Sequence, residues 1–110
     1  MDSFFEEWWR GNIVSRRPSV GYNTKEERQD NVLKGISDYE VYYKNELIGE
    51  VYKKTYIDLE MVTKFYWKYT SLDGTIDSAT YEKGIAVTKL YEAFRKQRME
   101  EQNEFSLQKV

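Results

Sequence analysis

The chain has 110 residues, with 17 Lys or Arg, 19 Asp or Glu, and neither Cys nor His. This length predicts a single domain. The missing residue types exclude a disulfide framework, a thiolate nucleophile, a zinc finger and a His general base. The net charge of -2 argues against a strongly basic nucleic-acid-binding protein.

No apolar run approaches the roughly 18 residues that a membrane span needs, and the first residues lack the basic and apolar regions of a secretory signal. We therefore expect a cytoplasmic protein without a membrane partner. Acidic residues occur as adjacent pairs in predicted helices, where they point apart, and no Gly-rich phosphate loop is present. We expect no enzymatic activity, no cofactor and no metal.

The first eleven residues predict a short helix. Ser3 and Glu6 have capping-box spacing, and Gly11 can end the helix. Its aromatic residues should fall on one side, because positions i and i+4 stack along a helix: Phe4, Phe5, Trp8 and Trp9. A helix this short must dock on the rest of the chain.

Residues 12–23 show no periodicity and are interpreted as a loop. Thr24 and Glu27 then form a second capping box for a helix over residues 25–34, which Gly35 ends. The apolar residues of this helix are Val32 and Leu33, so it should lie on the surface and dock by its last turn.

Residues 37–70 predict the sheet. Tyr- and Val-rich runs over residues 39–54 indicate a hairpin with a turn near residues 44–46, and residues 64–70 indicate a further strand. Gly49 indicates a bulge or a close backbone approach. Alternation over residues 57–62 suggests another strand or a strand extension, and a turn follows at Leu72-Asp73-Gly74.

Ser78 or Thr80 should cap a long helix over residues 80–102. One stripe at 3.6-residue spacing should pack on the sheet: Ala86, Val87, Leu90, Ala93 and Phe94. A second group on the other side either receives the N-terminal helix or forms an interface: Tyr81, Ile85 and Met99. Residues 103–110 lose the period and are expected to fray.

These elements predict an α+β fold. It has a three- or four-stranded antiparallel sheet, a long C-terminal helix packed on one face, and two short N-terminal helices. We interpret residues 1–110 as one domain, with a helical and loop segment (1–36), a sheet-plus-helix core (37–102) and a tail (103–110).

Two surfaces are candidates for function. The first is a protein interface formed by Phe4, Phe5, Trp8 and Trp9, whose alternative role is a lid over the core. The second is the sheet face opposite the helix, where rings and cations could bind single-stranded nucleic acid or simply form a solvated surface. Its residues are Tyr42, Lys44, Tyr52, Lys54, Lys64, Tyr66 and Lys68.

The leading hypothesis is a small non-enzymatic domain that binds another protein or a second copy of itself. One concrete form is a phage or mobile-element protein that inhibits a host or defence complex by occupying its surface. The alternative is a nucleic-acid-binding domain that uses the Tyr/Lys sheet face. A further alternative is a structural, self-assembling subunit.

Overall fold

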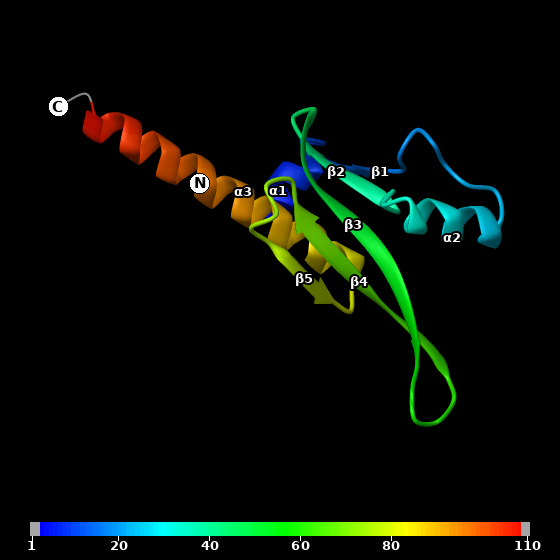
Figure 1. Ribbon diagram of the computed structural model, residues 1–110. Coiled ribbons are helices and arrows are strands. Elements are labelled where there is room, and N and C mark those ends of the chain that lie inside the picture. The colour runs from blue at the N-terminus through cyan, green and yellow to red at the C-terminus, as the bar shows by residue number, and fades with distance from the viewer. Residues whose placement is uncertain (1–2, 109–110) are drawn as a thin grey trace.

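The computed structural model describes residues 3–108, with side chains through residue 99. Five antiparallel strands lie side by side in chain order, and the last helix crosses one face of the sheet (Figure 1). The α+β class is confirmed, with five strands instead of three or four. In chain order the elements are α1 (Phe4–Trp9), β1 (Ile13–Arg16), α2 (Lys25–Leu33), β2 (Tyr39–Tyr43), β3 (Glu46–Ile57), β4 (Thr63–Ser71), β5 (Asp77–Thr80) and α3 (Lys83–Gln108).

Both predicted helix N-caps, Ser3 and Thr24, are present. Ser3 Oγ accepts a hydrogen bond from the N–H of Glu6 at 3.2 Å, and Thr24 Oγ1 accepts one from the N–H of Glu27 at 3.1 Å. The Glu27 carboxylate also accepts the N–H of Asn23 at 2.7 Å. These contacts satisfy donors that an α-helix leaves unpaired in its first turn, which is why α1 and α2 begin where the sequence indicates.

The two short edge strands contradict the sequence interpretation. β1 occupies part of the expected loop, and its Ile13 is buried in the core at 1% exposure. β5 contains Ser78 and Thr80, which were expected to cap the long helix, and that helix begins at Lys83. Four residues are too few to show a clear period of two, and β5 is polar and exposed, so neither strand has an apolar pattern.

The hairpin of β2 and β3 turns at Lys44 and Asn45, which both have positive φ, as the two-residue turn of this type requires. Val41 pairs with Gly49 and Tyr42 with Leu47, so one extra residue bulges from β3. A Cβ on Gly49 would lie 2.7 Å from Leu90 Cδ2. The bulge and the close approach expected at Gly49 are therefore both observed.

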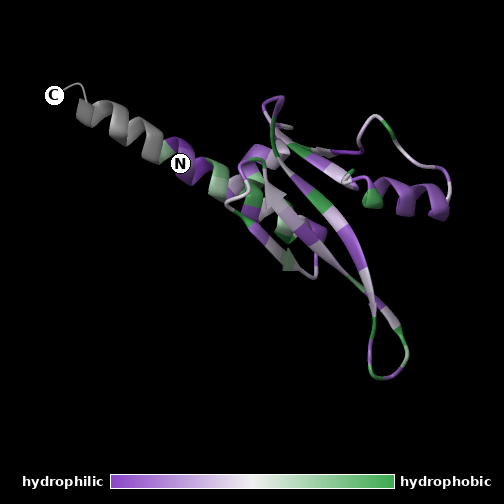
Figure 2. Cartoon of the chain, in the orientation of Figure 1, coloured by the Kyte–Doolittle hydropathy of each residue, from purple (hydrophilic) through white to green (hydrophobic). Residues whose placement is uncertain are grey.

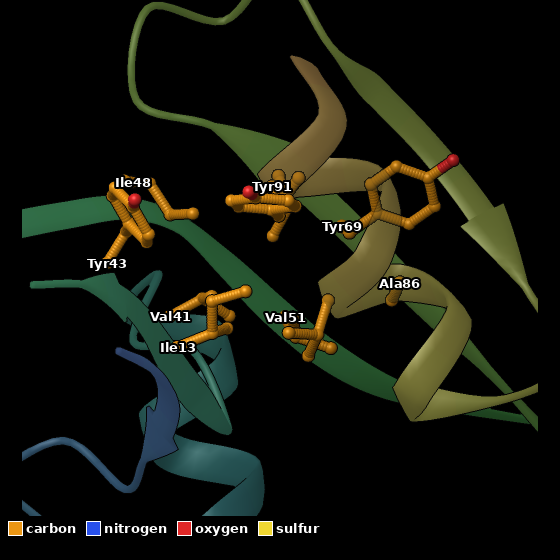
Figure 3. Packing of buried hydrophobic residues seen from close by; sticks show 10 residues of the cluster. Ile13, Val41, Tyr43, Ile48, Val51, Tyr69, Ala86 and Tyr91 are labelled. Atoms are coloured by element: carbon orange, nitrogen blue, oxygen red, sulfur yellow. The ribbon is translucent and has the colours of Figure 1, made fainter. Parts of the chain in front are cut away.

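The core lies between the sheet and α3 (Figure 3). Ala86, Val87 and Leu90 are buried as expected, and Phe94 packs at the edge of the cluster. Tyr91, which the predicted stripe omits, is 3% exposed. The remaining core residues come from the strands and include Ile13, Val41, Tyr43, Ile48, Val51 and Tyr69.

α1 packs on α3 through Phe4, whose ring centroid is 6.1 Å from that of Tyr91. The second group stays exposed: Ile85 and Met99 on α3, and Tyr81, which precedes the helix. α3 also runs beyond the sheet to Gln108, so the fraying expected from residue 103 is wrong through residue 108. Residues 109–110 lie outside the described residues.

α2 does not dock through Leu33, which is 85% exposed. An ion pair holds it instead. Arg28 Nε donates to Asp38 Oδ1 at 2.8 Å, and Arg28 Nη2 donates to the carbonyl of Lys53 at 2.5 Å. The buried Asp38 carboxylate also accepts the N–H of Lys53 at 2.6 Å. This network attaches α2 to the outer edge of β3.

β3 and β4 continue beyond the other strands as a two-stranded ribbon, which we call the arm (residues 54–66; Figure 1). β2 pairs with β3 up to Val51, and β5 pairs with β4 from Trp67 onward. The strand extension expected after residue 56 is seen at Ile57, whereas residues 58–62 form the turn of the arm.

Candidate functional site

The N-terminal helix is held by one face and exposes the other. Phe4 packs into the core, and Glu7 is only 2% exposed, with its carboxylate accepting Asn12 Nδ2 at 2.7 Å. Positions i and i+3 share a helix face, so docking through Phe4 and Glu7 turns the next residues outward. The sequence interpretation grouped all four aromatic residues, but the structure separates Phe4 from the other three.

The three outward rings form one exposed cluster, which we call the aromatic surface (Phe5, Trp8 and Trp9). Their exposures are 65%, 54% and 76%, respectively. The Phe5 and Trp9 rings stack with centroids 6.4 Å apart, and the Phe5 and Trp8 centroids are 6.3 Å apart. The cluster is therefore preassembled on a helix that is already fixed to the fold.

A groove of about 730 Å³ borders the aromatic surface. One wall comes from Trp8 and Trp9 of α1, and another from Gly84 and Val87 near the start of α3. β1 contributes further lining residues, including Val14. The groove and the rings together make a concave, largely apolar surface, which is the shape that an inserted side chain of another molecule requires.

The structure assembles most of the predicted Tyr/Lys face. Tyr52 lies opposite Lys68, and Lys54 lies opposite Tyr66, on the sheet face away from α3. Tyr42 and Lys64 share this face through the strand register. Lys44 does not join them, because it occupies the β2–β3 turn with its Nζ 5.4 Å from the centroid of the core residue Tyr43.

Charges on this open sheet face are balanced. Lys64 Nζ lies 2.9 Å from Asp58 Oδ2, and Lys68 Nζ lies 3.6 Å from Asp77 Oδ1. The strand register places four cations and four carboxylates on the face: Arg16, Lys54, Lys64 and Lys68 with Glu40, Glu50, Asp58 and Asp77. Such a surface attracts phosphate weakly, since affinity for nucleic acid depends on uncompensated positive charge.

The Tyr52 hydroxyl is also committed within the face. It donates to Glu50 Oε2 at 2.6 Å. Burial, followed by the contact with Glu50, raises the pKa of Tyr52 above its ordinary value, because both disfavour the phenolate. Tyr52 is therefore protonated at neutral pH and acts as a hydrogen-bond donor to Glu50.

Sequence reasoning missed a third surface at the end of the arm, where Figure 2 shows apolar colour on the turn. Leu59 is 103% exposed, Met61 81%, Ile57 64% and Phe65 50%. The alternation over residues 57–62 was the available signal. It was interpreted as a further strand or a strand extension, whereas β3 ends at Ile57 and residues 58–62 form the turn of the arm.

Among the side chains that the structure describes, residues 3–99, no group of three or more Asp or Glu residues is arranged to hold a metal ion. No helix in the described part of the chain has the length and apolar character of a membrane span. Comparison with protein-family models finds no match, and comparisons with curated proteins and with solved structures find no significant similarity. Function must therefore be argued from the surfaces described above.

Proposed function

We propose that the protein is a non-enzymatic binding domain that docks on another protein through the aromatic surface and its adjoining groove. The single observation that carries the proposal is the exposure of three large rings on a helix that the fold holds by other residues. Phe4 and Glu7 already attach α1 to the core. The fold therefore does not need the rings of Phe5, Trp8 and Trp9 to hold α1 in place.

The chemistry of this surface favours a protein partner. Aromatic side chains bury roughly 150–250 Å² each when covered, and Trp is enriched among residues that dominate binding energy. Glu6 and Arg10 are exposed beside the rings and supply a polar rim. Because the rings already contact one another, little side-chain entropy remains to be lost on binding.

Such a domain acts by occupying the surface of its partner. Inhibition of a host or defence complex by a phage or mobile-element protein is one form that this action can take. A nucleic-acid-binding role for the open sheet face receives less support, because its lysines face carboxylates. Absence of oligonucleotide binding at low salt, where electrostatic attraction is strongest, would eliminate that role.

The proposal is tested by recovering partners from a nuclease-treated extract of the native host with tagged wild-type protein and variants. Trp9→Ala should leave the melting temperature unchanged and weaken association by about 2 kcal/mol or more. Leu59→Ala is the matched control, because it removes a fully exposed apolar side chain from the arm, away from α1, and should bind this partner as the wild type does.

Phe4→Ala provides the opposite control. It should lower stability by roughly 2–4 kcal/mol, because this ring fills part of the core against Tyr91. The proposal fails if Trp8→Ala and Trp9→Ala both bind normally. It also fails if these two variants lose as much stability as Phe4→Ala, since the rings would then belong to the core.

A further inference from the structure

The arm carries open backbone groups along the outer edge of β3. Asp58 donates its N–H to the carbonyl of Val62 at 3.0 Å, which fixes the phase of the β3–β4 ladder. Hydrogen-bonded pairs alternate along an antiparallel ladder. The backbone groups of Lys54 and Tyr56 therefore point toward β4, and those of Thr55 and Ile57 point away from it.

Contacts elsewhere on the same edge agree with this phase. The N–H of Asp38 donates to the carbonyl of Val51 at 3.1 Å. The N–H of Lys53 donates to the Asp38 carboxylate, and the carbonyl of Lys53 accepts from Arg28. Both outward backbone groups of Lys53 are therefore already bonded. Among the described residues, no group bonds to the outward N–H and carbonyl of Thr55 or Ile57. An unpaired, exposed edge of this kind is a template for another strand.

The edge is complementary to itself. When two copies run antiparallel with Thr55 of one opposite Ile57 of the other, all open groups pair and four hydrogen bonds form. Tyr56 then lies on the two-fold axis. A shift by two residues brings in either Lys53, whose groups are already bonded, or Leu59, which lies beyond the strand. Only the register with Thr55 opposite Ile57 therefore pairs every open N–H and carbonyl of this edge.

We propose that a second copy of this chain docks on the β3 edge of the arm in this register, so that the two arms form a continuous four-stranded antiparallel ribbon. The interaction is separate from the aromatic surface on α1. It gives the chain a two-fold, closed dimer in which each copy contributes the same residues, as isologous interfaces require.

Side-chain charge supports the register. Lys54 of one copy lies opposite Asp58 of the other, and the pair occurs twice across the two-fold axis. Opposite charges directly across a ladder stabilise it. The ion pair with Lys64, followed by the N–H of Val62, holds the pKa of Asp58 below its ordinary value. The carboxylate therefore stays ionised at neutral pH.

Apolar surface on the same edge also supports a second copy. A groove of about 360 Å³ lies between the end of α2 and the β3 edge. Its lining is mixed: Val32 and Leu33 are apolar, and the others are Arg28, Gln29, Lys53, Lys54 and Thr55. In the proposed register, the turn of the second copy's arm, which carries Leu59, follows the paired strand toward Lys53 and this groove. Docking would bring the fully exposed Leu59 to the exposed Leu33. Figure 2 shows apolar colour at these two places, the end of α2 and the tip of the arm.

Single cysteines test the register directly, because the chain has no Cys of its own. Tyr56→Cys should form a disulfide-linked dimer on mild oxidation, since position 56 faces itself across the axis. Lys64→Cys is the matched control. It lies directly opposite Tyr56 on β4, so its two copies would stand about 14 Å apart, three strand spacings, and should not cross-link.

Proline substitutions test the edge. Thr55→Pro removes an N–H that points to the second copy and leaves the β3–β4 ladder intact, so the dimer dissociation constant measured by sedimentation should rise about tenfold or more, one donor being lost from each copy. Thr63→Pro removes an outward N–H from the other edge of the arm and should leave the dimer unchanged.

Hydrogen exchange on the unmodified protein gives a result that does not depend on any variant. In the dimer, the amides of Thr55 and Ile57 should be protected, while those of Thr63 and Phe65 exchange quickly. A monomeric wild type whose four outward amides exchange equally fast would overturn the proposal. Equal cross-linking at positions 56 and 64, or a dimer unaffected by Thr55→Pro, would overturn it as well.

Discussion

Gly49 has no room for a side chain. An added Cβ would lie 2.8 Å from the Thr70 carbonyl oxygen, a backbone atom, and 2.7 Å from Leu90 Cδ2. We expect Gly49→Ala to lower the free energy of unfolding by about 1–3 kcal/mol, because either β4 or α3 must shift to make room for the added methyl group. Gly84→Ala is the control. Its Cβ meets open space in the first turn of α3, so denaturant unfolding should show no loss of stability.

Asp73 makes stability depend on acid pH. Ser71, followed by the N–H and hydroxyl of Thr75, donates to its carboxylate and lowers the pKa of Asp73 to about 2. In the unfolded chain this pKa is about 3.9. The resulting stabilisation is fully present above pH about 4 and is lost as the pH falls through about 2.

Asp73→Asn should therefore flatten the decline in unfolding free energy between pH about 4 and about 2. A residual slope should remain, because the pKa of Asp58 is also lowered, chiefly by Lys64. The measurement is urea unfolding at a series of pH values, with an NMR titration of the Asp73 carboxyl as a check. A wild-type midpoint near the ordinary Asp value would contradict the expectation.

Among the helices and strands, the sequence predicted correctly those features that depend on residues close together in the chain, such as helix starts and the hairpin turn. Ser3 and Thr24 begin helices because their hydroxyls bond within three residues. The β2–β3 turn also depends only on neighbouring residues. The short edge strands β1 and β5 form because a neighbouring strand offers a free edge. The partner of β1 lies 24–30 residues along the chain, and β5, although it follows β4 directly, has no apolar alternation that would indicate a strand.

In the candidate site, too, the sequence predicted local features but not those that depend on tertiary contacts. Helical spacing identified the aromatic cluster, but it could not show that Phe4 faces inward while Trp9 stays exposed. That outcome depends on the buried Glu7, a charged residue that a hydrophobic pattern assigns to solvent. Strand alternation assembled the open sheet face except for Lys44, which lies in the β2–β3 turn. It could not show that Asp58 and Asp77 form ion pairs with Lys64 and Lys68.

The packing of α3 gives a prediction at this scale. Leu90 is 1% exposed, so Leu90→Ala should cost roughly 2–5 kcal/mol in thermal or urea unfolding. Phe94 lies at the edge of the core with its ring centroid 5.5 Å from that of Tyr43, so Phe94→Ala should cost less than Leu90→Ala. Ile85→Ala, on the exposed side, should change stability by about 0.5 kcal/mol or less. Equal losses at Leu90 and Ile85 would contradict the packing.

The whole molecule is elongated. Its radius of gyration is 16.5 Å, whereas a compact chain of this length would have about 13 Å. Two projections account for the difference, the arm at one end and the last turns of α3 at the other (Figure 1). A small core therefore supports two extended structures, and in the arm the side chains of residues 59–65 are exposed.

The projecting part of α3 should be dispensable for folding. Within the described side chains, the core contacts of α3 end at Phe94, and the exposed ion pair of Arg98 with Glu46 adds little stability. Removal of residues 103–110 should reduce the helical circular-dichroism signal while the melting temperature stays within about 2 °C, because little cooperative structure is lost. Truncation after Leu90 is the positive control. It removes the buried Tyr91 ring together with Phe94, so it should abolish the cooperative melt. A large drop in melting temperature on removing residues 103–110 alone would show that this segment packs on the fold, and the projection would then be part of the core structure.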